Sequence, residues 1–118
     1  MDFFDVNIRY LGGLLSAYDL LTSGQFPNNY RKDHVDALLS QAKVLGHAIS
    51  PVFETPTGLP APNANFSSHE PVKSTSNING HTYNTTNTAQ AGTMILECYR
   101  LSDLTGDESF RNHVCVFL

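Results

Sequence analysis

Two side chains near the N-terminus have the types and spacing for acid–base chemistry. Asp5 and Arg9 are four residues apart in a segment with helical periodicity. Residues at positions i and i+4 lie on one helix face, so the Arg9 guanidinium could hold the carboxyl group of Asp5. A purely structural interpretation is also open. In that case Asp5 is a favourable charge near a helix start, and Arg9 is its ion-pair partner.

Two further polar side chains lie in a later helical segment. Glu97 is a carboxylate on an otherwise apolar helix. A buried carboxylate needs a partner, so Glu97 is either a pocket residue or a member of a structural network. Gln90 lies near the start of the same helix, where the pattern alone indicates a solvated residue of the first turn.

Composition and spacing exclude several other kinds of site. The net charge of −4 and the scattered Lys and Arg residues argue against nucleic-acid binding, which requires a basic face. No apolar run approaches the roughly 20 residues that span a bilayer, and no cleavable signal peptide is visible. Gly12-Gly13 lacks the spacing of a phosphate-binding loop. The histidines have no zinc-site spacing; they are His34, His47, His69, His81 and His113.

The elements that would carry these residues begin with two helices. Residues from Phe3 to Leu21 predict a helix that is apolar nearly all round and therefore buried on most sides. Its Gly12-Gly13 pair costs about 1 kcal/mol per Gly in helix propensity, which close backbone contact with a neighbour would offset. Residues from Lys32 to Ser50 predict a helix with one apolar stripe. A buried helix followed by a one-sided helix indicates an inner and outer pair.

Residues 51–87 differ in composition from the helices. They hold five of the six prolines and many Asn, Ser and Thr residues, which predicts a long surface loop. Asn79-Gly80 favours a tight hairpin turn inside it. Asn65-Phe66-Ser67 and Asn84-Thr85-Thr86 fit the N-glycosylation acceptor pattern, a weak indication of a secretory route.

Two more helices complete the chain. The third is expected from Ala89 to Leu104, with Thr88 as its N-cap and Gly106 as its C-terminal stop. The fourth opens at Asp107. Cys98 and Cys115 both lie among apolar residues and are expected to be buried small hydrophobes.

Three stretches together resemble glycoside hydrolase family 47. Phe4 to Tyr18 is similar to the family pattern F-E-x-x-I-R-x-L-G-G-L-L-S-A-Y. Phe53 to Pro60 is similar to F-x-T-P-T-G-x-P. Ala91 to Asp107 is similar to G-T-L-x-L-E followed by L-S-x-L-T-G-D. The order and spacing match, and the first stretch alone is highly specific.

The resemblance implies an all-α fold, the (α/α)7 barrel, in which inner helices line a deep pocket. This chain would provide about two of its αα-hairpins, with the Pro/Asn-rich loop at residues 51–87 lying at the substrate end. We expect residues 1–111 to be part of the catalytic domain and residues 112–118 to be a divergent tail.

The resemblance also implies an activity, hydrolysis of terminal α-1,2-linked mannose from high-mannose N-glycans with inversion. Asp5 matches the family's general acid, and Arg9, Gln90 and Glu97 are the expected substrate-binding residues. This sequence departs from the family at two of these positions. Asp5 replaces a Glu and is one methylene shorter, and Gln90 replaces a pocket Glu. A proton donor displaced by about 1 Å can cost 10²-fold in rate, so we expect reduced activity.

The family's calcium and its catalytic base are implied to lie outside this chain, so we expect no hydrolase activity and no structural calcium in the isolated chain. The resemblance implies a glycoprotein substrate in the secretory pathway, either the endoplasmic reticulum and Golgi or outside the cell. Membrane attachment would come only from a segment outside this chain. Two alternatives stay open: a mannose-binding quality-control protein related to the degradation-enhancing mannosidase-like proteins, and a small helical domain without glycan chemistry.

Overall fold

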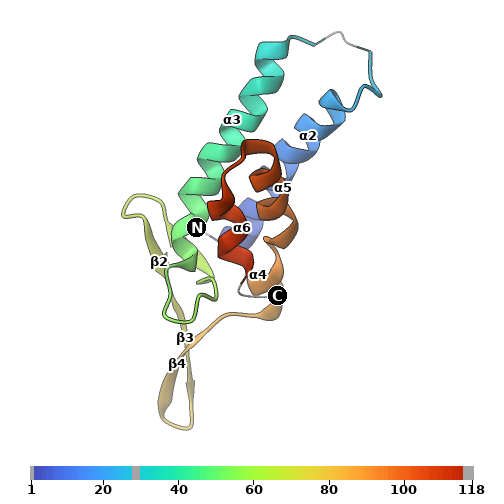
Figure 1. Cartoon of the computed structure of the whole chain (residues 1–118). Coiled ribbons are helices and arrows are strands. Elements are labelled where there is room, and N and C mark those ends of the chain that lie inside the picture. The colour runs from blue at the N-terminus through green and yellow to red at the C-terminus, as the bar shows by residue number, and fades with distance from the viewer. Residues whose placement is uncertain (1, 28–29, 116–118) are drawn as a thin grey trace.

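Helices form most of the computed structural model, which describes residues 2–27 and 30–115 (Figure 1). The helices are α1 (Phe3–Asp5), η1 (Val6–Leu11), α2 (Gly12–Thr22), α3 (Lys32–Ile49), η2 (Ser50–Phe53), α4 (Thr88–Gly92), α5 (Ile95–Thr105) and α6 (Glu108–Val114). The strands are β1 (Asn63–Asn65), β2 (Glu70–Val72), β3 (Ser74–Ile78) and β4 (His81–Thr85). The molecule is elongated, with extents of 61 × 29 × 20 Å.

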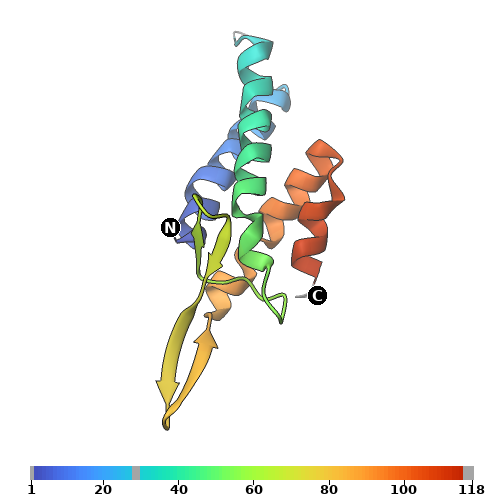
Figure 2. The same cartoon turned by 90° about the vertical axis from the view of Figure 1, so that its left-hand side faces the viewer.

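Two αα-hairpins make up the helical body. Helix α2 packs against α3, and α5 packs against α6. The hairpins meet chiefly through α3 and α5, and in Figure 2 the first helix and the α5–α6 pair lie on either side of α3. The all-α expectation of a partial αα-barrel is confirmed in its main features, with two small β-hairpins added at one end.

The predicted first helix is one continuous run through α1, η1 and α2, because Val6 and Gly12 keep right-handed helical dihedrals at the junctions. Its burial is one-sided. Leu11 and Leu15 are buried, whereas Tyr10 and Leu20 are 61% and 50% exposed. The expectation of burial on most sides is therefore wrong for this chain, because α3 and α5 cover only one side of the helix.

Helix α3 confirms the predicted amphipathic pattern almost to the residue. Its stripe buries Val35, Ala42, Gly46 and Ile49. At Gly46 the backbone comes very close to the second hairpin, since a Cβ atom there would lie 2.5 Å from Leu101 Cδ2 and 2.9 Å from Phe110 Cε1. Real Cβ atoms essentially never make such contacts, so this helix crossing requires glycine.

The predicted loop at residues 51–87 contains regular structure that its composition did not reveal. Strands β1 and β2 pair antiparallel, and so do β3 and β4, with Ile78 opposite His81. Asn79 and Gly80 have φ angles of 51° and 80°, so the expected tight turn is confirmed. Strand β3 is exposed along its whole length. A strand that buries neither face shows no hydrophobic alternation, so the sequence indicated this strand only through the hairpin turn that follows it.

The predicted third helix is broken near its start. Helix α4 ends at Gly92 and α5 begins at Ile95. The N-cap of α4 is Asn87 rather than the expected Thr88, because the Asn87 side chain accepts a hydrogen bond from Gln90 N. Gly106 ends α5 in the left-handed conformation at φ 71°, as expected.

The cysteines differ from each other in burial. Cys98 is buried in the core, and its burial raises the pKa of the thiol to about 12. Cys115 is exposed, so the expectation that both are buried is wrong for this residue. Cys115 follows the last buried position of α6, Val114, and lies outside the apolar stripe.

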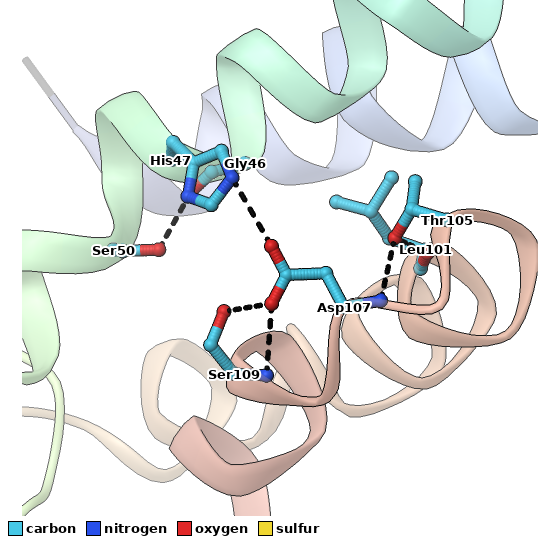
Figure 3. Close-up of polar contacts among 7 residues, drawn as sticks. All are labelled: Gly46, His47, Ser50, Leu101, Thr105, Asp107 and Ser109. Atoms are coloured by element: carbon cyan, nitrogen blue, oxygen red, sulfur yellow. Dashed lines mark hydrogen bonds and ion pairs between the residues drawn. The ribbon is translucent and has the colours of Figure 1, made fainter.

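Asp107 joins the turn between α5 and α6 to helix α3 (Figure 3). One carboxylate oxygen caps α6, accepting hydrogen bonds from the Ser109 hydroxyl at 2.6 Å and the Ser109 amide at 3.1 Å. The other oxygen lies 3.3 Å from Nε2 of His47 on α3. The Ser109 hydroxyl and amide hold the pKa of Asp107 below its ordinary value.

Gly46→Ala should lower the free energy of unfolding by about 1–3 kcal/mol, because the new methyl group overlaps Leu101 and Phe110. The matched control is Gly13→Ala on α2, where nothing lies within 4 Å of the added Cβ. Ala has the higher helix propensity, so this variant should be neutral or more stable. Urea unfolding followed by circular dichroism measures both. Equal midpoints for the two variants would contradict the proposed close approach.

Asp107→Asn should make the chain less sensitive to acid. Because the folded state depresses the pKa of Asp107, the stability from its ionised form is complete above the ordinary pKa of 3.8 and is lost as the pH falls through the folded value. Between about pH 5 and about pH 2.5, the urea concentration at the midpoint of unfolding should therefore fall further for the original chain than for Asp107→Asn. The control is Asp36→Asn, at an exposed position on α3. Its urea midpoint should fall as much as that of the original chain over the same pH range.

Candidate functional site

The first turns of the chain have an unusual backbone conformation that includes the predicted acid–base pair. Asp2 caps the helix, its side chain accepting a 2.9 Å hydrogen bond from Phe4 N. The helix then widens into a π-helix at η1, where the backbone N–H of Gly12 donates to the carbonyl oxygen of Asn7, five residues earlier. Such π-helical turns are rare and occur frequently at functional sites. Asp5 lies immediately before η1, and Arg9 lies within it.

Asp5 and Arg9 lie side by side, as their spacing predicted. Nε of Arg9 donates to Oδ1 of Asp5 at 3.1 Å. The two side chains are 54% and 69% exposed, so the described residues do not enclose them in a cavity. A pair this exposed contributes little to stability. Its carboxyl and guanidinium groups are instead free to contact a ligand.

Glu97 approaches the same stretch from α5. Its Oε1 lies 3.5 Å from the position that a Cβ atom would occupy at Gly12. The carbonyl oxygen of Asn7 lies 3.4 Å from the same position. Its Oε2 is buried and has no hydrogen-bond partner among the described residues. The structure therefore brings Glu97 to the junction of η1 and α2. The expected close backbone contact of the glycine pair is not observed, because a Cβ atom at Gly12 would make only ordinary van der Waals contacts and one at Gly13 would have nothing within 4 Å.

Gln90 lies on the short helix α4 and is half-buried. Its backbone N–H donates a 2.7 Å hydrogen bond to Oδ1 of Asn87, the N-cap of α4. Within residues 2–27 and 30–115, no hydrogen bond joins the Gln90 side chain to Asp5, Arg9 or Glu97. The sequence placed Gln90 in the same pocket as these residues, and this chain by itself does not bring it into contact with them.

Asn7 is a site residue that the sequence analysis missed. It is completely buried, and its Nδ2 donates to the carbonyl oxygen of Thr93 at 3.1 Å. Thr93 lies at the break between α4 and α5. The spacing of the sequence could have revealed it. Phe3 and Leu11 lie four residues to either side of Asn7, so the three residues share one helix face, and both apolar neighbours are buried.

The segment between the two helical hairpins lies next to the start of the first helix. Phe3 N donates to the carbonyl oxygen of Pro62 at 3.4 Å, and Asp2 forms a β-bridge with Asn63. Pro62 and Asn63 thus lie beside the turn of the first helix that immediately precedes Asp5. A hollow of about 240 Å³ lies here between the T-P-T-G turn and the base of the β3–β4 hairpin. Its polar lining residues include Thr55, Thr57, Lys73, Asn84 and Thr86.

The described residues offer no cluster of carboxylate side chains for the calcium that the family resemblance implies. No group of three or more His, Cys, Asp or Glu side chains among them could hold a metal ion. Calcium requires six to eight oxygen ligands, and Asp5 is instead paired with Arg9.

Among residues 2–27 and 30–115, no helix is long and apolar enough to cross a membrane.

Comparisons with known proteins agree with this geometry. The family model of glycosyl hydrolase family 47 matches residues 1–117, which extends beyond Arg111, where the sequence motifs ended. The chain is 44% identical to the probable mannosyl-oligosaccharide alpha-1,2-mannosidase 1B of Aspergillus fumigatus, over 91% of this chain and 20% of that protein. It is 42% identical to the mannosyl-oligosaccharide alpha-1,2-mannosidase of Penicillium citrinum, over 91% of this chain and 19% of that protein.

A solved structure gives the same result for the fold. The alpha-1,2-mannosidase from Trichoderma reesei superposes with a TM-score of 0.82 and 38% sequence identity, covering 98% of this chain and 22% of that one. The chain thus spans about a fifth of the length of the relatives it matches. With the family pattern extending over nearly all of its residues and its helical hairpins superposing on that enzyme, the chain belongs to glycosyl hydrolase family 47.

Proposed function

We propose that this chain is part of the catalytic domain of an inverting α-1,2-mannosidase that removes terminal mannose from high-mannose N-glycans. The observation that carries the proposal is the Asp5–Arg9 pair on the exposed side of the first helix, within the most specific family motif. In this role Asp5 donates a proton to the leaving glycosidic oxygen. Arg9 orients the carboxyl group and binds hydroxyl groups of the sugar.

The mechanism requires more than this chain contains. An inverting glycosidase has a second carboxylate, which activates a water on the opposite face of the sugar about 6.5–9.5 Å from the acid. Glu97 lies against Gly12, and its Oε2 atom is buried rather than free to activate a water. We therefore assign the base to the part of the domain outside this chain, together with the calcium ligands. In this proposal the isolated chain does not hydrolyse glycans.

The secretory pathway is the proposed location. High-mannose N-glycans are made and trimmed there, and the two acceptor tripeptides fit exposure to the glycosylation machinery. Asn65 and Asn84 are both exposed, Asn65 at the end of β1 and Asn84 on β4. Exposed asparagines of this kind are the positions at which glycans are attached.

A specific observation supports a second candidate function, a mannose-binding protein of glycoprotein quality control. Asp5 is one methylene shorter than the family's Glu, so its proton would be withdrawn by about 1 Å, enough to cost 10²-fold in rate. Arg9 and the Asp5 carboxylate would still bind sugar hydroxyls. The same site would then recognise mannose with little or no cleavage.

The test of the proposed function places this chain in a complete catalytic domain. Residues 2–115 replace the matching segment of the Penicillium citrinum enzyme, and this graft is incubated with a high-mannose N-glycan. NMR should detect β-mannose as the first free anomer, since the reaction inverts an α-linkage. Asp5→Glu should raise kcat by about 10- to 100-fold, and Asp5→Asn should abolish release. The isolated chain should release no mannose.

The control is Asp33→Asn, which removes an exposed carboxylate on α3, far in sequence from Asp5, and should leave kcat unchanged. A graft that binds the glycan but gains nothing from Asp5→Glu would support the mannose-binding function. If Asp5→Asn released mannose as fast as the graft, Asp5 would not be the proton donor.

A further inference from the structure

Asn7 is a polar residue at a position where its neighbours are apolar. Its exposed fraction is 0%, and Phe3 and Leu11 on the same side of the helix are also fully buried. Burying an amide is unfavourable unless its polar atoms form hydrogen bonds. An apolar residue would fill this interior at lower cost, so the presence of Asn7 calls for an explanation beyond packing.

The hydrogen bond of Asn7 links the two inner helices. Its Nδ2 donates to the carbonyl oxygen of Thr93, 86 residues away in the sequence. Thr93 is the C-cap of α4, and α5 begins two residues later, so this carbonyl lies where the helix is interrupted. The Oδ1 atom of Asn7 has no partner among the described residues. Donation to Thr93 is thus the contact that fixes the side chain.

The main chain of Asn7 belongs to the π-helical turn. Its carbonyl oxygen accepts the hydrogen bond of Gly12 N that closes η1. Asn7 is therefore held at both ends, by its side chain to the second hairpin and by its backbone to the widened turn. A π-helical turn is less regular than an α-helical one and needs such support from its surroundings to persist.

Asn7 also lies midway between Asp5 and Arg9 in the sequence. Residues two apart on a helix point to nearly opposite sides, and this is the observed arrangement, with Asp5 and Arg9 exposed and Asn7 buried. A displacement of Asn7 would move both exposed side chains together. Within residues 2–27 and 30–115, no other residue of η1 forms a side-chain hydrogen bond to the second hairpin.

We propose that Asn7 is a positioning residue, which sets the depth and rotation of the Asp5–Arg9 turn by tethering it to the Thr93 carbonyl. Its effect on catalysis rests on the proposed function, whereas its effect on the turn does not. Loss of the amide donor leaves the Thr93 carbonyl unpaired and lets η1 shift. A shift of about 1 Å is enough to reduce the rate by about 10²-fold.

The test uses the same graft, carrying Asp5→Glu to raise the signal. Asn7→Leu removes the donor and should lower kcat by about 10- to 100-fold, with KM within about twofold of the parent. Ser102→Ala is the matched control, because Ser102 is also a buried polar residue but lies on α5, far from Asn7 in the sequence, and its hydroxyl has no hydrogen-bond partner among the described residues. It should leave kcat unchanged. Thermal midpoints of all variants separate misplacement from unfolding.

A third variant, Asn7→Asp, tests the donor itself. Its buried carboxyl group can donate to the Thr93 carbonyl only when protonated, and burial favours the protonated form. The ratio of its kcat to that of the parent should therefore rise as the pH falls. A ratio that is independent of pH, or an Asn7→Leu variant with the parent's kcat, would overturn the proposal.

Hydrogen exchange at the Gly12 amide keeps the two proposals distinguishable. This amide closes the π-helical turn and should be protected in the parent graft and exchange faster in Asn7→Leu. If no graft releases mannose, the proposed function fails, and the exchange rates alone decide the role of Asn7. Equal protection of Gly12 in both proteins would show that Asn7 does not hold the turn.

Discussion

The close approach of α3 to the second helical hairpin at Gly46 is the constraint on which the rest of this structure depends. Leu101 and Phe110 occupy the space that a side chain at Gly46 would take. This crossing joins the hairpins and so sets where α5 lies relative to the first helix. Asp107 supports the same junction, since it caps α6 and contacts His47, one residue beyond Gly46 (Figure 3).

The junction has a consequence at the other end of the inner helices. Once α5 is held against α3, the Thr93 carbonyl and Glu97 lie against the first helix, at Asn7 and Gly12. Both inner helices are irregular at this level, one by a π-helical turn and the other by a break. The irregular turn includes Arg9 and begins directly after Asp5. Packing in the body of the molecule thereby orients an exposed pair of charged groups.

The part of the first helix that α3 and α5 leave uncovered carries large apolar residues. Ile8, Tyr10 and Leu20 are 44%, 61% and 50% exposed, and Leu96 on α5 is 79% exposed. An apolar groove of about 470 Å³ also lies between the first helix and α3. Exposed surface of this kind normally marks an interaction site. In a family whose matched members are about five times longer, it fits a surface that further helices cover.

The sequence alone determined the helices that have regular periodicity, the Asn79-Gly80 turn, the Gly106 stop and the pairing of Asp5 with Arg9. These features depend on neighbours within a few residues, so local spacing and turn chemistry are enough to predict them. Periodicity also indicated an inner and outer pair of helices, and the family motifs added the αα-barrel to which the pair belongs. Apart from the hairpin turn at Asn79-Gly80, the sequence did not predict the β-strands of residues 51–87, because exposed strands have no apolar alternation.

Only the tertiary structure decided the role of Asn7, the place of Glu97, the exposure of Cys115 and the break between α4 and α5. Two of these depend on a residue far away in the chain: Asn7 on Thr93, and Glu97 on Gly12. A buried amide and a solvated amide have the same letter in a sequence, and a helical pattern continues through a break that a distant side chain stabilises. Long-range contacts of this kind exist only after the two hairpins have packed together.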